Sequence, residues 1–359
     1  MHPYRQFPDR QFWNRAVSGT PWADVFLGQT PKFRIDPTDR VASAGSCFAR
    51  RIAEHLIGSG YRYELFEPAH PLVESRAADL GYGVFSCRYG NVYTTRQLRQ
   101  LFDEALGVRA PIYRFARTGP DAYVDLMRPN LGPAAAFASP EEAQADRLYH
   151  LARVREMIEQ MGVFVFTLGL TEAWEETAAG VVYGSHPAVI QSTLQADHVT
   201  AVNFDYAQVL EDLEYVLDLI ARHSQVGGPK VVLTVSPVAL AATHQDSHVV
   251  TATTYSKAVL RAVAGKVAAT RAEVDYFPSY EIFSLAQSFG QFLAEDLRDV
   301  NPRGVAVAMR AFEDAFMQAG AGPAPVAAKP PTTAPAPSPT KSAAEAECDE
   351  IANAIFGDR

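Results

Sequence analysis

The segment Val163–Leu168 (VFVFTL) constrains the fold more than any other part of this 359-residue chain. A strand built from these residues is apolar on both faces, which is typical of a central strand in a parallel sheet that helices cover on both sides. Four further short apolar segments have the same character: Val41–Ala44, Tyr61–Phe66, Lys230–Val235 and Val274–Phe277. The sequence therefore predicts a five-stranded parallel sheet.

Segments with helical periodicity separate these strands, because their apolar residues recur three and four positions apart. The expected helices are Phe48–Ile57, Asp205–His223, Thr254–Arg271 and Pro302–Gln318. Alternating strands and helices predict a doubly wound α/β sandwich. The long stretch 67–162 holds an extra helix at Thr95–Leu106 and an extended segment at Ala122–Met127, so we expect an inserted cap region over one edge of the sheet.

The composition of the chain changes at residue 320, and we expect the α/β domain to occupy residues 1–320. Residues 321–343 contain no aromatic side chain and seven prolines, a composition that cannot bury enough surface to fold and that predicts a disordered linker. In 344–359, the apolar residues Cys348, Ile351 and Ile355 form one stripe of a short amphipathic helix. A helix this short is marginal alone, so we expect it to bind a protein partner.

The charge balance opposes binding to nucleic acid, since 41 acidic residues exceed 32 basic ones and the net charge is −9. No apolar segment has the length of a signal peptide or a membrane span, which favours a cytoplasmic protein. The three cysteines are too few and too scattered for a disulfide framework or a zinc site. We expect no cofactor and no metal.

Ser46 follows the first expected strand and precedes the first expected helix. In open α/β sheets, ligands bind at the carboxyl ends of the strands, and a serine on such a turn has N–H groups of the helix N-terminus beside it. Ser46 is therefore a candidate nucleophile, with the alternative that its hydroxyl only caps the helix. Cys47 is a weaker rival, because a thiol between strand and helix is more often a small buried apolar residue.

The string Gly45-Ser46-Cys47-Phe48-Ala49 resembles the signature of the GSCFA family. Five further strings are similar to that family and occur in the same order: Tyr89-Gly90-Asn91-Val92-Tyr93-Thr94, Gly169-Leu170-Thr171-Glu172-Ala173-Trp174, Ser236-Pro237-Val238, Tyr255-Ser256-Lys257 and Tyr276-Phe277-Pro278-Ser279-Tyr280-Glu281. The family in turn resembles the SGNH (GDSL-like) hydrolases. That resemblance implies a flavodoxin-like three-layer sandwich, a catalytic serine after the first strand, and action on esters such as the O-acetyl groups of carbohydrates.

The resemblance also implies roles for single positions. Ser46 matches the nucleophile, and its N–H with Gly90 and Asn91 would form the oxyanion hole. The third block of the SGNH hydrolases begins at Gly169 but lacks the usual asparagine, so one oxyanion donor is missing from the pattern. The cluster Glu172, Glu175 and Glu176 reads as the start of a solvated helix, with Glu172 kept as a secondary site candidate.

The C-terminal block departs from the SGNH pattern at the position of the catalytic base. SGNH hydrolases carry an Asp and a His three residues apart, and this chain has Asp296 followed by Asp299 where the histidine belongs. Another base is needed, because a serine is a poor nucleophile without one. The loop after the fourth strand holds His244 and His248, and we expect His248 to be the base, His244 the second choice and Asp296 the residue that orients it, with Asp299 as a secondary candidate.

These observations together predict a serine hydrolase or O-acyltransferase that acts on ester groups, with a carbohydrate as the expected carrier. Two other interpretations remain open. A non-catalytic protein on the same fold would keep the crevice for binding a carbohydrate or another ligand after losing the histidine. Alternatively, the domain is a scaffold whose C-terminal helix recruits a partner enzyme, for example in polysaccharide synthesis.

Overall fold

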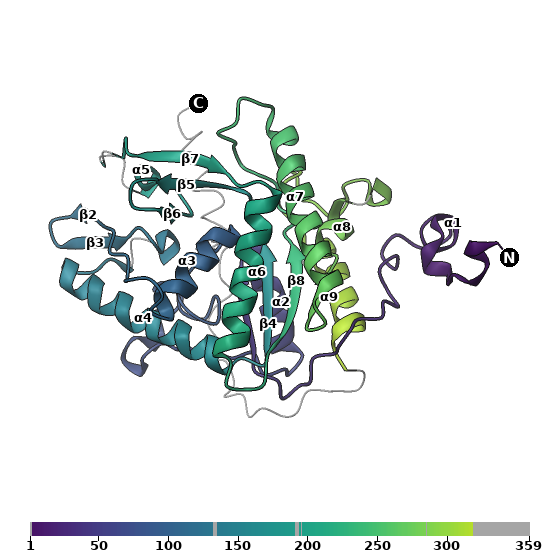
Figure 1. Cartoon of the computed structure of the whole chain (residues 1–359), viewed down its shortest axis with the longest axis horizontal. Coiled ribbons are helices and arrows are strands. Elements are labelled where there is room, and N and C mark those ends of the chain that lie inside the picture. Colours follow the sequence, from purple (N-terminus) through teal and green to yellow (C-terminus); the bar gives the residue numbers. More distant parts are fainter. Residues whose placement is uncertain (1, 132–134, 191–193, 195, 285, 319–359) are drawn as a thin grey trace.

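The computed structural model describes residues 2–131, 135–190, 194, 196–284 and 286–318 (Figure 1). Its centre is a four-stranded parallel sheet in the order β1 (Val41–Gly45), β4 (Val163–Leu168), β8 (Lys230–Val235), β9 (Val274–Phe277). All four strands were expected at these positions, and the α/β class is confirmed. The linker and terminal helix expected in 321–359 lie outside the described residues.

The fifth expected strand, Tyr61–Phe66, is wrong as a strand, because only Tyr63 forms an isolated parallel bridge to Val41. The backbone runs beside β1 for a short distance, where the Glu64 N–H donates to the Val41 carbonyl at 2.9 Å. Further along, the Phe66 N–H donates to the Ser86 carbonyl at 2.8 Å instead. The segment therefore turns away from the sheet before a ladder can form.

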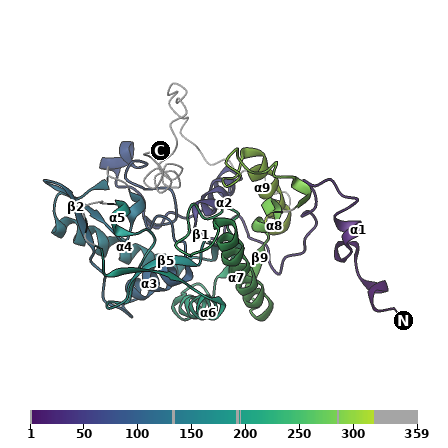
Figure 2. The same ribbon diagram turned by 90° about the horizontal axis from the view of Figure 1, so that it is seen from above.

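Helices cover both faces of the sheet, as Figure 2 shows from above. Side chains alternate along a strand, so Val163 and Val165 of β4 face one layer while Phe164 and Phe166 face the other. The first layer contains α2 (Cys47–Gly58) and α9 (Pro302–Phe316). The second layer contains α3 (Thr95–Ala105), α4 (Pro140–Gln160), α6 (Tyr206–His223) and α7 (Val249–Thr270).

The inserted stretch does more than cap an edge. Leu98 and Phe102 of α3 and Val154 of α4 pack in the same core cluster as Phe164 and Phe166 of the sheet. Two of the helices that cover this face therefore come from the insertion. The remaining elements are β2 (Phe115–Gly119), β3 (Ala122–Asp125), α1 (Trp13–Ala16), α5 (Pro187–Ile190) and α8 (Ser279–Ser284).

A second sheet was not expected from the sequence. It is antiparallel, with the order β6 (Val181–Tyr183), β5 (Glu172–Glu176), β7 (Val199–Asn203). The interpretation of the glutamate cluster as a helix start is therefore wrong, because Glu172–Glu176 is the central strand of this sheet. Its backbone groups are paired on both sides, with Trp174 opposite both Tyr183 and Ala201.

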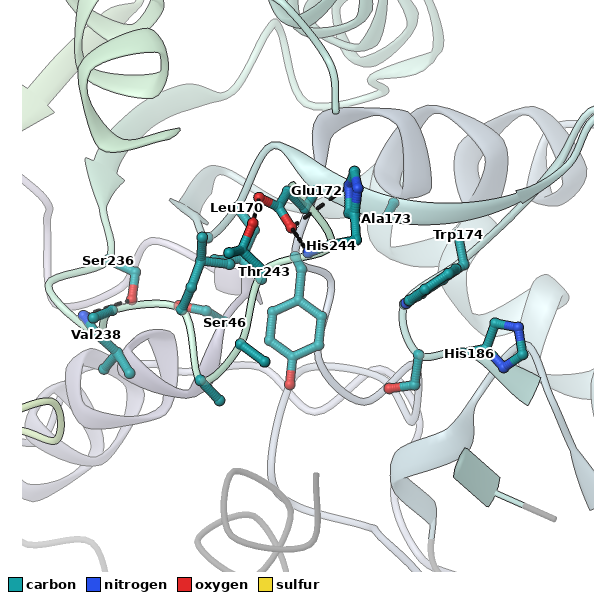
Figure 3. A pocket seen from close by; sticks show the side chains of 18 of the residues that line it. Ser46, Leu170, Glu172, Ala173, Trp174, His186, Ser236, Val238, Thr243 and His244 are labelled. Atoms are coloured by element: carbon teal, nitrogen blue, oxygen red, sulfur yellow. Dashed lines mark hydrogen bonds and ion pairs between the residues drawn. The ribbon is translucent and has the colours of Figure 1, made fainter. Parts of the chain in front are cut away.

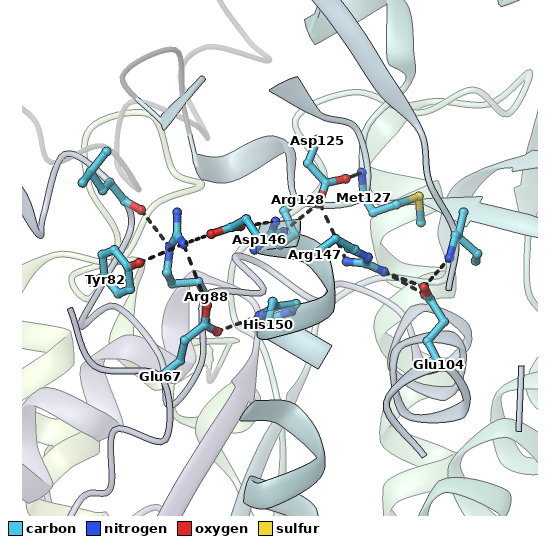
Figure 4. A network of polar contacts seen from close by, with 12 residues as sticks. Glu67, Tyr82, Arg88, Glu104, Asp125, Met127, Arg128, Asp146, Arg147 and His150 are labelled. Carbon is cyan, nitrogen blue, oxygen red and sulfur yellow. Dashed lines mark hydrogen bonds and ion pairs between the residues drawn. The ribbon is translucent and has the colours of Figure 1, made fainter. Parts of the chain in front are cut away.

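A buried ionic network joins different segments of the insertion to one another (Figure 4). Arg147 of α4 donates from Nη2 to both carboxylate oxygens of Glu104 in α3, at 2.8 and 2.9 Å. Both side chains are at most 2% exposed. The further pairs are Arg128 with Asp125 and Asp146, Arg88 with Asp146, and His150 with Glu67. Because each charge has an opposite partner, the network holds α3, α4 and β3 in one arrangement.

Candidate active site

The turn that carries Ser46 can be formed only with glycine before it. Gly45 has φ of 133°, and a Cβ on this residue would lie 2.3 Å from the Thr167 carbonyl oxygen of the neighbouring strand. Such a contact is impossible for any side chain, so β1 and β4 come together closely only at a glycine. β1 therefore ends beside the end of β4, and Ser46 lies where both strands finish.

The hydroxyl of Ser46 does not cap the helix that follows it. Ser46 occupies the N-cap position of α2 with extended backbone angles, yet its side chain makes no cap hydrogen bond. Its Oγ is buried and has no hydrogen-bond partner among the described residues. A buried hydroxyl left unpaired costs about 1–3 kcal/mol, which makes Ser46 a candidate for a role other than stability. The Ser46 N–H, expected as an oxyanion donor, donates instead to the Thr167 carbonyl oxygen at 3.3 Å.

Ser46 lines a pocket of about 340 Å³ (Figure 3). The pocket lies at the carboxyl edge of the parallel sheet, where ligands bind in open α/β folds. One part of its wall comes from the loop after β8, and another part comes from the antiparallel sheet and α5. The lining includes the side chains of Leu170, Glu172, Trp174, His186, Val238, Leu240, His244 and Arg298.

Glu172 and His244 form a polar cluster in the wall of this pocket (Figure 3). Glu172 accepts hydrogen bonds from the Thr243 hydroxyl at 2.7 Å and from the His244 backbone N–H at 3.2 Å. The imidazole Nε2 of His244 lies 3.5 Å from the same carboxylate and 3.1 Å from the Val202 carbonyl. Since a carbonyl only accepts, Nε2 carries the hydrogen, and Nδ1 accepts a hydrogen bond from the Gln245 side-chain amide at 3.1 Å.

His248 has a different place from the one expected. α7 begins at Val249, five residues earlier than the periodicity indicated, and His248 is its N-cap, with Nδ1 accepting the Val250 N–H at 3.2 Å. The side chain is exposed and does not line the Ser46 pocket. His186 does line it and packs edge-on against Trp174, with ring centroids 4.6 Å apart, and burial lowers its pKa.

Asp296 and Asp299 do not line the pocket either. Asp296 is exposed and closes its own turn, since its Oδ1 accepts the N–H groups of Arg298 and Asp299, both at 3.0 Å. The guanidinium of Arg298 lines the pocket instead and donates to Asp299 and to the Ala239 carbonyl, both at 3.2 Å. The C-terminal block thus contributes a cation to the pocket wall rather than a base.

The segment that contains Gly90 and Asn91 passes beside the Ser46 turn in space, but the Asn91 side chain lines another cavity. The Val92 N–H donates to the Gly45 carbonyl at 2.9 Å, which brings this segment beside the serine turn. The Asn91 side chain donates to the Tyr93 hydroxyl at 3.2 Å and lines a separate cavity of about 30 Å³ next to Arg147. N–H groups at the N-terminus of a helix lack intrahelical carbonyl partners, so those at the start of α2 are candidate oxyanion donors.

Lys257 is the residue that sequence reasoning missed. It is fully buried on α7, and its Nζ donates to the Gly169 carbonyl at 2.8 Å. Gly169 in turn packs against Ser46, because a Cβ there would lie 3.3 Å from the Ser46 Cβ. Burial lowers the pKa of Lys257 to about 7, with nearby Cys47 opposing that shift and Arg298 adding to it. The signal was available, since Lys257 lies on the apolar face of its helix with Leu260 and Ala264.

The lowered pKa of Lys257 has a measurable effect on stability. Between about pH 7 and pH 10 the unfolded chain holds a proton on this amine that the folded chain lacks, so stability rises with pH and is lost as pH falls toward 7. Relative to Lys257→Met, the parent is expected to gain about 2 kcal/mol of unfolding free energy from pH 7 to pH 9. Urea denaturation at both pH values measures this, with the exposed Lys266→Met on the same helix as control. Parallel profiles for the parent and Lys257→Met would contradict the neutral amine.

The protein is thus a parallel α/β sandwich with a pocket at the carboxyl edge of its sheet. At this pocket, the turn after the first strand carries a buried serine hydroxyl that does not cap the following helix. Residues 40–312 match the GSCFA family, and the chain belongs to that family. No curated protein and no solved structure matches the chain. Within the part of the chain that the structure describes, no helix is long and apolar enough to cross a membrane, and no three His, Cys, Asp or Glu side chains are grouped to hold a metal ion.

Proposed function

We propose that this protein is a serine hydrolase or O-acyltransferase of the SGNH (GDSL-like) type that acts on ester groups, with Ser46 as the nucleophile. The observation that carries the proposal is the Ser46 hydroxyl, which is buried at the pocket, without a cap bond and without a hydrogen-bond partner in the described residues. A nucleophile needs its lone pairs available to the substrate, whereas a structural serine uses them for the protein.

The order of the chain segments supports the SGNH type. With the short segment around Tyr63 placed beside β1, the order reads Tyr63 segment, β1, β4, β8, β9. This corresponds to the flavodoxin-like order 2-1-3-4-5, in which the ligand binds where the first and third strands are neighbours. Ser46 follows β1 and Gly169 follows β4, so the proposed nucleophile lies at that crevice.

In the proposed mechanism, Ser46 attacks the ester carbonyl while His244 takes the hydroxyl proton. No direct hydrogen bond joins the Ser46 Oγ to His244 in this structure, so the mechanism requires the two groups to come within reach when the substrate binds. The N–H groups at the start of α2 stabilise the oxyanion, and His244 then returns the proton to the leaving alcohol, which leaves the acyl group on the Ser46 Oγ. Water, or an acceptor alcohol in a transferase, next gives a proton to His244 and attacks this acyl ester, and the proton returns to Ser46 as the acid or the new ester is released. We assign the base to His244 rather than His248, because His244 lines the pocket and has a carboxylate partner in Glu172. Glu172 thereby takes the orienting role first expected of Asp296.

This assignment separates the two histidines by experiment. His244→Ala is expected to lower kcat on an ester that requires Ser46 by about a hundredfold, the scale of lost general base catalysis. His248→Ala removes only an exposed helix cap, so turnover is expected to stay within about twofold and stability to fall by about 1 kcal/mol. Initial rates on p-nitrophenyl esters at pH 7 to 8 measure both. Loss of turnover in His248→Ala alone would show that His248, the residue first expected, is the base.

A fluorophosphonate probe tests the nucleophile directly, because it forms a covalent bond only with an activated serine. We expect a single adduct on a peptide that contains Ser46, found by mass spectrometry, and no adduct on Ser46→Ala. Cys47→Ala is the matched control, and it should still be labelled because the adjacent thiol is not the reacting group. Absence of any adduct between about pH 6 and pH 9 would overturn the hydrolase proposal.

The alternative is a ligand-binding protein on the same fold. The observation that favours it is Arg298, which pairs with Asp299 at the position where SGNH hydrolases place the histidine. An unreactive Ser46 together with measurable binding of an ester or amide ligand in the pocket would support this second function.

A further inference from the structure

Both charged side chains in the Ser46 pocket are held by other protein groups. Glu172 accepts the Thr243 hydroxyl and the His244 N–H, while Arg298 donates to the Ala239 carbonyl and to Asp299. A charged ligand would have to displace these contacts before it could bind either group. The pocket is therefore not built to select a charged substrate.

The loop after β8 contributes an apolar part of the pocket wall. Val238 and Leu240 are 8% and 6% exposed, and the small side chains of Ala239, Ala241 and Ala242 lie beside them in the lining. A sugar ring against such a wall would lose hydrogen bonds to water without replacing them. An alkyl chain loses none and gains about fourfold in affinity for each methylene that it buries.

The polar cluster determines which end of an ester lies against this wall. The leaving alcohol takes its proton from the base, so it must lie toward His244, whose neighbours are Glu172 and Gln245. Figure 3 shows this cluster on one side of Ser46 and Val238 on another. The wall around Val238 is thus left for the acyl chain, while Trp174, whose ring centroid lies 6.0 Å from that of His244, is an apolar neighbour on the alcohol side.

Resting on the proposed ester hydrolysis, we propose that the pocket binds the acyl chain of the substrate, and that this chain is a medium-length alkyl group rather than acetyl. The volume of the pocket supports this length of the acyl chain. An apolar cavity of about 150 Å³ is enough to bind benzene, with its six carbon atoms. The Ser46 pocket has about 340 Å³ and opens to solvent, which fits a chain of about six to ten carbons.

Two isomeric esters test which end of the substrate binds. Ethyl octanoate and octyl acetate have the same atoms, and differ only in whether the long chain is acyl or alcohol. We expect kcat/KM for ethyl octanoate to exceed that for octyl acetate at least tenfold, measured by acid release at constant pH below the micelle concentration. In a p-nitrophenyl series, kcat/KM should rise at least a hundredfold from acetyl to octanoyl. Equal rates for the isomers, or a preference for acetyl, would overturn the inference while the hydrolase proposal stands.

A substitution in the wall gives a second test. Ala241→Phe narrows the pocket and should lower the octanoyl-to-acetyl ratio of kcat/KM at least tenfold. Ala178→Phe, at an exposed position outside the lining, is the matched control and should leave the ratio unchanged. An unchanged ratio in a folded Ala241→Phe variant would count against the acyl site.

Binding without turnover separates the inference from the function on which it rests. Octanamide is expected to bind Ser46→Ala at least a hundredfold more tightly than acetamide, measured by titration calorimetry. Octanamide binding combined with no ester hydrolysis by the parent would overturn the proposed function and retain the apolar chain site. Failure of octanamide to bind would overturn the chain site whatever the hydrolysis assays show.

Discussion

Replacing Ser46 with alanine is expected to lower ester hydrolysis by at least about a thousandfold, because no other described hydroxyl occupies the turn after β1. The same substitution is expected to leave the unfolding free energy unchanged or slightly raised. Its Oγ has no hydrogen-bond partner to lose, so removing it leaves no other group unsatisfied. A serine that capped α2 would instead cost about 1 kcal/mol when replaced.

Rates on p-nitrophenyl octanoate and urea denaturation measure the two effects on the same protein samples. Loss of activity without loss of stability is the signature of a group kept for chemistry at the expense of folding. Full activity in Ser46→Ala would rule out the serine mechanism. A drop of about 1 kcal/mol in stability with no change in rate would show that the helix cap is its role after all.

Replacing Arg147 with methionine is expected to have the largest effect on stability, a loss of about 3–5 kcal/mol. The substitution leaves the Glu104 carboxylate buried without its cation, and burial already raises the pKa of that carboxyl despite the attraction of Arg147. Arg155→Met, on the same helix α4, is the control, because Arg155 is 52% exposed and its pair with Glu159 is worth little.

The double variant Arg147→Met/Glu104→Gln separates the loss of an attraction from the burial of an unpaired charge. Removing both charges should recover a large part of the stability, since the main cost of the single variant is the isolated carboxylate. Midpoints of urea denaturation for the four proteins give the comparison. If Arg147→Met behaves like Arg155→Met, the network in Figure 4 contributes nothing to holding α3 and α4 together.

The strands of the parallel sheet could be predicted from the sequence, because each one is a short apolar segment that is recognisable by itself. Val163–Leu168, Lys230–Val235 and Val274–Phe277 have the bounds expected for them, since a continuous apolar run between turn residues needs no knowledge of its neighbours. The antiparallel sheet was missed for the opposite reason. Glu172–Glu176 is mostly polar, and it is a strand because Val199–Asn203 and Val181–Tyr183 pair with it.

Local sequence patterns were enough to predict four strands of the parallel sheet, the position of Ser46 after the first of them and the family of the chain, because each of these depends on short continuous segments. That His244 rather than His248 lines the pocket, and that Lys257 is buried behind it, depends on contacts between distant segments. The contacts responsible join Thr243 to Glu172 and Lys257 to Gly169, pairs that are 71 and 88 positions apart. No local pattern encodes such contacts, because they form only when packing of α7 and the strand ends against one core brings the segments together.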